Sequence, residues 1–165
     1  MTLSPEARDR AWLREAIVLS HAAPRSTRAF SVGCAIVDPE GRCVATGFSR
    51  ENDDLAHAEE AAIEKAERAG VDLRACTLYS SLEPCGARLS PRRSCVARIL
   101  EVGIPQVVYA YAEPSLFVEA HGERLLRAAG VEVRSYPEFA DEVVAVNSHL
   151  LGATEERKRP GGERV

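Results

Sequence analysis

The chain has 165 residues, of which 45% are hydrophobic and 28% are charged, so a single globular domain is the natural expectation. A formal net charge of −4 argues against bulk attraction to nucleic acid, and no stretch reaches the roughly 18 apolar residues of a membrane span. The N-terminus lacks the long apolar run of a secretory signal. Five cysteines, an odd number, favour metal binding or burial over disulfides, and we expect a cytoplasmic protein.

Apolar spacing and turn residues divide the chain into helices and strands. Residues 5–23 have the spacing of a helix, and residues 32–36 and 43–48 are typical of a hairpin around the turn Asp38-Pro39-Glu40-Gly41. An Ala- and Glu-rich helix is expected over 57–70. Strands and helices then alternate: strand 76–82, helix 95–102, strand 106–112, helix 119–129, strand 131–136 and helix 139–151.

This order predicts an α/β fold, a three-layer α/β/α sandwich around a mixed five-stranded sheet. The short turn makes the first two strands antiparallel. The last two strands, joined through one helix, should be parallel with a right-handed crossover. We expect one domain over residues 1–152, followed by a polar, frayed tail at 153–165.

Two cysteines and a histidine lie at the predicted starts of two helices. His57 opens the Ala- and Glu-rich helix, Cys85 follows a strand behind Glu83-Pro84, and Cys95 begins the next helix. If the two helices lie side by side, one imidazole nitrogen and two sulfurs can converge on a tetrahedral zinc ion. Helix N-termini also favour the thiolate form of cysteine.

Three protein ligands leave the fourth zinc position for water, which is the catalytic pattern. Zinc lowers the pKa of its water to about 7 and makes a nucleophile at neutral pH. Glu59 is too close to His57 along the helix to serve easily as a fourth ligand. We expect it to carry protons between the water and the substrate.

Other interpretations of these residues stay open. A structural zinc site needs a fourth ligand, for which Cys34, Cys76 and His121 are the candidates. Without any metal, His57 would be a helix cap, Glu59 a solvated acid and the two cysteines buried thiols. For Cys34, Cys43 and Cys76, which lie in apolar strand patterns, we expect packing.

His57-Ala58-Glu59 with Pro84-Cys85 and a later cysteine resembles the zinc nucleoside and base deaminases. Those enzymes usually have two residues between the cysteines. This chain has a nine-residue loop, 86–94, which resembles that of the riboflavin-pathway pyrimidine deaminases. VGCAIVDPEGRCVATG and YAYAEPSLFVEAHGERLLRAAGVEV are similar to further segments of that family. The resemblance covers about residues 10–136 and implies a cytidine-deaminase-like fold with Zn²⁺ as cofactor.

The resemblance implies a hydrolytic deaminase acting on a C–N bond of a cyclic amidine. The best substrate is the diaminohydroxyphosphoribosylaminopyrimidine of riboflavin synthesis. The riboflavin enzymes commonly have an asparagine before Val-Gly-Cys where this chain has Ala29, and Phe30-Ser31-Val32-Gly33 looks more like free cytidine deaminases. Cytosine, cytidine or dCMP-like substrates are therefore an alternative. A tRNA adenosine deaminase and a non-catalytic zinc-binding module are two more.

Candidate substrate contacts surround the predicted zinc site. Phe30 would border or stack on the base, with core burial as the alternative, and Arg88, Arg92 and Arg93 would bind phosphate, with plain solvation as the alternative. The remaining candidates are Ala58, Glu83, Ser49 and Arg50. The expected partner is a small nitrogen heterocycle, phosphorylated if the arginines bind phosphate, with no nucleic acid or membrane. Relatives are usually oligomers, so the resemblance implies a homo-oligomer, with a dimer favoured.

Overall fold

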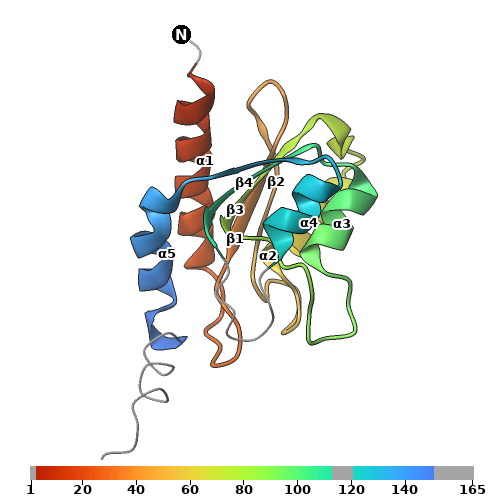
Figure 1. Ribbon diagram of the computed structural model, residues 1–165. Coiled ribbons are helices and arrows are strands. Elements are labelled where there is room, and N and C mark those ends of the chain that lie inside the picture. Colours follow the sequence, from red (N-terminus) through yellow and green to blue (C-terminus); the bar gives the residue numbers. More distant parts are fainter. Residues whose placement is uncertain (1–2, 113–120, 151–165) are drawn as a thin grey trace, which may run out of the picture.

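The computed structural model describes residues 3–112 and 121–150 (Figure 1). The helices within these residues are α1 Pro5–Ser20, α2 Ala58–Arg68, α3 Cys95–Val102, α4 Gly122–Ala128 and α5 Ala140–Val146. The strands are β1 Gly33–Val37, β2 Cys43–Phe48, β3 Thr77–Leu82, β4 Gln106–Tyr111 and β5 Glu132–Ser135. Short 3₁₀ turns cover Leu73–Ala75 and Pro137–Phe139. The predicted tail at 153–165 and the predicted start of the 119–129 helix lie outside the described residues.

The predicted order of elements is confirmed, and their bounds differ by a few residues. Helix α1 stops three residues before its predicted end, because the amides of residues 21–23 bond carbonyl oxygens three residues back instead of four. Helix α3 begins at Cys95 behind the N-cap Ser94, whose hydroxyl accepts from the Ala97 amide, and ends at Gly103 with φ of 74°. A left-handed glycine is a common helix terminator.

The five strands form one mixed sheet in the order β2-β1-β3-β4-β5. Strand β1 is antiparallel to both β2 and β3, whereas β3, β4 and β5 run parallel. The prediction that the last two strands are parallel is confirmed. The parallel part also includes β3, because α3 carries the chain back across the sheet before β4 begins.

Helices cover both faces of the sheet, which confirms the three-layer arrangement. Helices α1 and α5 lie against one face, and α2, α3 and α4 lie side by side on the other (Figure 1). Alternate strand residues point into the two cores, so that Ile36 and Val107 face α2 and α3 while Val37 and Val108 face α1 and α5.

Two glycines let the helices approach the sheet closely. A Cβ on Gly33 would lie 1.9 Å from the Ala16 carbonyl oxygen, and one on Gly47 would lie 2.3 Å from the Ala58 carbonyl oxygen. Only a residue without a side chain fits at these two positions. Gly47 therefore allows the first turn of α2 to pack close to β2 and sets the distance between them.

A buried carboxylate joins the layer of α1 to the sheet. Asp9 of α1 is 1% exposed and accepts hydrogen bonds from Tyr79 Oη at 3.0 Å and Tyr136 Oη at 2.8 Å. Arg134 Nε of β5 donates to the same carboxylate at 2.7 Å. The network is satisfied, as a buried charge requires.

The three cysteines outside the predicted metal site differ in burial. Cys34 and Cys76 are buried, as expected for packing. The expectation is wrong for Cys43, which is exposed at the start of the edge strand β2. Among the described residues, no helix has the length and apolar character needed to cross a bilayer.

Candidate metal centre

The predicted ligands converge because two helix starts and the end of a central strand meet. His57 directly precedes α2, Cys85 lies three residues beyond β3, and Cys95 is the first residue of α3. Helices α2 and α3 are neighbours on one face of the sheet (Figure 1). The backbone also closes the gap between the cysteines, since the Val96 amide donates to the Cys85 carbonyl oxygen at 3.1 Å.

The distances among the three side chains fit one small ion. His57 Nδ1 lies 3.3 Å from Cys95 Sγ and 3.5 Å from Cys85 Sγ, and all ligand atoms lie within 4.8 Å of one another. Zinc–sulfur bonds of about 2.3 Å and zinc–nitrogen bonds of about 2.0 Å give tetrahedral edges of roughly 3.5–3.8 Å. One imidazole and two sulfurs at this spacing suit zinc.

The pKa values of the Cys85 and Cys95 thiols are shifted in opposite directions. Hydrogen bonding from Cys95, and then from His57, holds the pKa of Cys85 well below its usual range. The hydrogen bond to Cys85 and burial raise the pKa of Cys95. The Cys95 amide also points at Cys85 Sγ, at 3.4 Å. One sulfur is thus already favoured as a thiolate, which is the form that binds metal.

Glu59 lies beside the ligands and is only 3% exposed. Ser80 Oγ of β3 donates to its Oε1 at 2.9 Å, and Cys95 Sγ lies 3.3 Å from its Oε2. Burial raises the pKa of the Glu59 carboxyl. A carboxyl with a raised pKa, aimed at the metal position, suits a group that takes up and returns protons.

The fourth-ligand candidates lie elsewhere. Within residues 3–112 and 121–150, the group of side chains close enough to share an ion consists of His57, Cys85 and Cys95. Neither Cys34 nor Cys76 nor His121 belongs to that group. This arrangement favours a catalytic zinc site over a structural one.

Phe30 lies in the loop that precedes β1, and Arg50, just after β2, reaches back to that loop. Phe30 is 7% exposed and packs in the core beside α2 and α3. Arg50 donates to the carbonyl oxygens of Pro24 at 2.9 Å and Phe30 at 3.1 Å, with its own φ at 60°. Ser49 Oγ accepts from the Val32 amide at 2.9 Å. Arg50 and Ser49 therefore shape the loop that carries Phe30.

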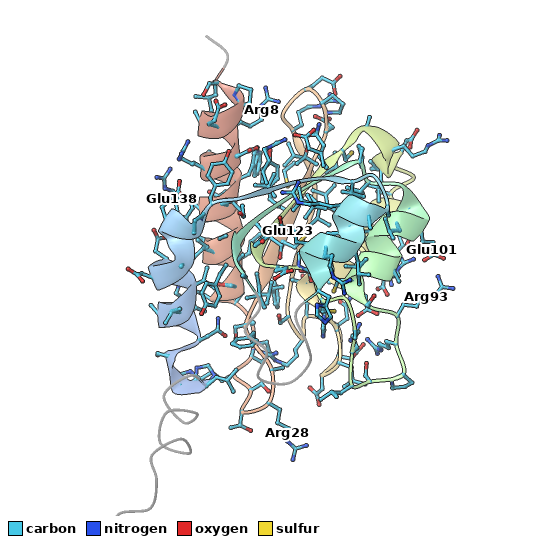
Figure 2. The ribbon with its side chains drawn as sticks, viewed as in Figure 1. Arg8, Arg28, Arg93, Glu101, Glu123 and Glu138 are labelled. Atoms are coloured by element: carbon cyan, nitrogen blue, oxygen red, sulfur yellow. The ribbon has the colours of Figure 1, made fainter. Side chains whose placement is uncertain are left out.

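The three arginines of the loop 86–94 lie in different environments. Arg88 is buried and pairs with Glu60, whereas Arg92 is half-buried and pairs with Asp53 at 2.9 Å. Arg93 is mostly exposed and pairs with Glu101 of α3 at the periphery of the molecule (Figure 2). Of the three, Arg92 and Arg93 present guanidinium groups to solvent.

Ala58 and Glu83 are both buried next to ligands. The Glu83 carboxylate accepts from the Glu123 amide at 2.8 Å and so holds the first turn of α4. A Cβ on Gly122 would lie 1.8 Å from the Pro84 carbonyl oxygen, so α4 begins in direct contact with the turn before Cys85.

Sequence reasoning missed two residues that support this region. Ser80 orients Glu59, but every residue from Leu78 to Leu82 is buried, so alternation gives no sign of which face Ser80 takes. Asn147 is 1% exposed and accepts from the Ser31 amide at 2.7 Å, across 116 residues of chain. Only the folded chain brings these partners together.

Curated relatives of the chain include deaminases. It is 40% identical over 125 residues, 73% of its length, to a diaminohydroxyphosphoribosylamino-pyrimidine deaminase of Schizosaccharomyces pombe. It is 32% identical over 111 residues to a probable cytosine deaminase of the same organism, covering 66% of this chain and 64% of that one. The chain spans about a third of the length of the first of these relatives.

Solved structures share the fold. The Rib2 deaminase of Aspergillus oryzae matches with a TM-score of 0.78 at 26% identity, over 91% of this chain and 96% of that one. Residues 6–111 match the family described as the cytidine and deoxycytidylate deaminase zinc-binding region. That segment contains the three candidate ligands and Glu59. The chain therefore belongs to the cytidine and deoxycytidylate deaminase family.

Proposed function

We propose that the protein is a zinc-dependent hydrolytic deaminase of the diaminohydroxyphosphoribosylaminopyrimidine of riboflavin synthesis. One observation carries the deaminase chemistry: a buried Glu59 carboxyl lies beside a nitrogen–sulfur–sulfur ligand set. The substrate rests on the S. pombe relative, which is named for this reaction and is 40% identical to this chain.

The proposed reaction replaces a ring amine by a carbonyl oxygen. His57, Cys85 and Cys95 would hold the zinc ion, which would supply the activation of a water molecule at neutral pH. Glu59 takes a proton from that water as its oxygen bonds to the amine-bearing ring carbon. Glu59 passes this proton to the ring nitrogen, and then carries the second proton of the water, from the hydroxyl now on the ring carbon, to the amine. The C–N bond breaks, so one water is consumed and one ammonia is released.

The substrate contacts remain part of the proposal. Phe30 and Ala58 are the candidates for an apolar wall beside the ring, and Ser49 and Arg50 hold the loop that carries Phe30. Glu83 fixes α4 against the same turn. Arg92 and Arg93 are the better candidates for the phosphate, because they are more exposed than Arg88. Guanidinium groups match phosphate geometry.

A substrate panel tests this function. Purified protein with one equivalent of zinc is mixed with the phosphorylated pyrimidine, its dephosphorylated form, cytosine, cytidine or dCMP, and ammonia release is measured. We expect ammonia from the phosphorylated pyrimidine and a higher KM for the dephosphorylated form. The absence of ammonia from that compound, with rapid release from another member of the panel, contradicts the proposed substrate.

Deamination of a cytosine-type substrate is the second candidate. The similarity to a probable cytosine deaminase favours it, as does Ala29 at the position where riboflavin enzymes commonly carry asparagine. In the panel, this function predicts ammonia from cytosine or its nucleosides. A non-catalytic zinc module instead predicts bound metal and no ammonia from any compound.

We also propose a cytoplasmic homodimer. Thiolate ligands and three further free thiols suit a reducing compartment. Leu100 of α3 and Leu125 of α4 are 39% and 38% exposed on neighbouring helices, which supports association through this face. Analytical ultracentrifugation of the protein and of a Leu100→Glu/Leu125→Glu variant tests this: the variant should sediment as a monomer.

A further inference from the structure

Arg88 lies in the loop between the two cysteines, yet its side chain is only 3% exposed. Its Nη1 donates to Glu60 Oε2 at 3.1 Å and to the Arg93 carbonyl oxygen at 3.2 Å. Its Nη2 donates to the Leu55 carbonyl oxygen, and its Nε is buried without a partner among the described residues. These contacts are with α2, with the segment before it and with the loop 86–94 itself.

The partner of Arg88 is connected to a zinc ligand. Glu60 is the third residue of α2, its side chain is 14% exposed, and its Oε2 accepts from the His57 amide at 3.3 Å. The same carboxylate oxygen therefore binds the backbone of His57 and the guanidinium of Arg88. Leu55, whose carbonyl oxygen accepts from Arg88 Nη2, lies two residues before His57. Arg88 thus ties the loop that carries Cys85 and Cys95 to the segment that carries His57.

The Arg88–Glu60 ion pair is largely buried, so removing either partner should have a large effect. A guanidinium removed from water requires a paired charge and hydrogen bonds, and deleting one partner of a buried pair is far more disruptive than deleting an exposed one. Arg92 also reaches Glu60, but at 3.5 Å, and its side chain is 33% exposed. Arg92 therefore replaces Arg88 poorly. Arg93 pairs with Glu101 and has no contact with Glu60 among its ion pairs.

We infer that Arg88 is a positioning residue for zinc, which holds the intercysteine loop against the His57 turn so that the three ligands meet. It is not a phosphate ligand, because its Nη atoms are engaged with Glu60, Leu55 and Arg93. This inference rests on the proposed function only in that the site binds zinc. Partners that orient metal ligands typically change metal affinity by about 10- to 100-fold when removed.

The test measures zinc affinity by competition with a chromophoric chelator, without substrate. Arg88→Met, which keeps an unbranched apolar stem, should weaken zinc binding by about 10- to 100-fold. Glu60→Gln keeps an acceptor for the His57 amide but loses the charge, and should also weaken binding. The double variant should lie within about 2-fold of Arg88→Met, because both changes remove one interaction. Arg93→Met, in the same loop, is the matched control and should bind zinc normally.

The outcomes separate the roles. Unchanged zinc affinity in Arg88→Met overturns the inference. A raised KM for the phosphorylated substrate, measured in a separate assay, would then identify Arg88 as a phosphate contact. If Arg88→Met does not fold, as judged by circular dichroism, Arg88→Lys and Glu60→Gln decide: normal zinc affinity in both overturns the inference, and weakened affinity supports it. The zinc titration uses no substrate. A wild-type protein without deaminase activity therefore refutes the proposed function, but the comparison of zinc affinities among the variants stays valid.

Discussion

Glu59 is held in place by two neighbours that do not compete for the same oxygen. Ser80 bonds one carboxylate oxygen, and the other faces Cys95 and the ion position. The carboxyl is therefore oriented before substrate arrives, which is a requirement for efficient proton transfer. Its raised pKa comes chiefly from burial, so a change in its surroundings alters its acidity as well as its position.

Replacing Glu59 by Gln keeps the shape and the bond from Ser80 but removes the proton carrier. We expect the rate of ammonia release to fall by about 10²- to 10⁴-fold. Zinc content, measured by atomic absorption, should stay at the wild-type level, since Glu59 is not among the three ligands. A Gln variant with wild-type turnover shows that another group carries the proton.

At the scale of elements, the contact between α2 and β2 decides where His57 and Glu59 lie. Replacing Gly47 by Ala places a methyl group 2.3 Å from the Ala58 carbonyl oxygen and 2.7 Å from the Ala62 amide nitrogen. Because both neighbours are backbone atoms, α2 has to move. We expect a loss of about 1–3 kcal/mol in the free energy of unfolding, measured with urea, together with weaker zinc binding.

A substitution on the same strand controls for strand propensity. Thr46 is adjacent to Gly47 and half-buried, so Thr46→Ala should change stability by less than about 1 kcal/mol and leave zinc affinity unaltered. If Thr46→Ala and Gly47→Ala change stability and zinc affinity equally, the close approach at Gly47 does not set the distance between α2 and β2.

The helices and strands were predictable because local signals agree with the fold. Gly103 and Gly130 end α3 and α4, where each adopts a positive φ. The convergence of His57, Cys85 and Cys95 was predictable because these residues lie at helix starts and after a strand end, where neighbouring helices meet the edge of the sheet. Arg88 was not predictable in its role, because an arginine in a polar loop gives no sign in sequence of a buried carboxylate 28 residues away.

At the scale of the whole molecule, Asp9 joins α1 to two strands far apart in sequence. Replacing it by Ala leaves Arg134 and the hydroxyls of Tyr79 and Tyr136 without their acceptor. We expect a loss of about 1.5–3 kcal/mol in the free energy of unfolding. Glu138→Ala, which removes the exposed pair with Arg10, should cost less than about 1 kcal/mol. A smaller loss at Asp9 than at Glu138 contradicts this assignment.

Zinc itself should stabilise the folded chain, because its ligands come from segments that only folding brings together. At zinc concentrations 1,000-fold above Kd, the expected gain is about 4 kcal/mol. Thermal unfolding of chelated protein should shift to lower temperature and recover when zinc is added, along with activity. Cys95→Ser should show a much smaller shift, and an equal one indicates that the metal binds elsewhere.

The central position of β3 predicts that two parts of the site differ in how often their backbone hydrogen bonds open. Glu59 is fastened to Ser80, on a strand bonded to neighbours at both sides, whereas residues 86–94 belong to no helix or strand. Backbone amide protons of β3 should exchange with deuterium only through global unfolding, and those of the intercysteine loop through local opening. Zinc would then dissociate when the loop 86–94 opens locally, while Glu59 stays in place. The empty site could therefore bind zinc again without global refolding.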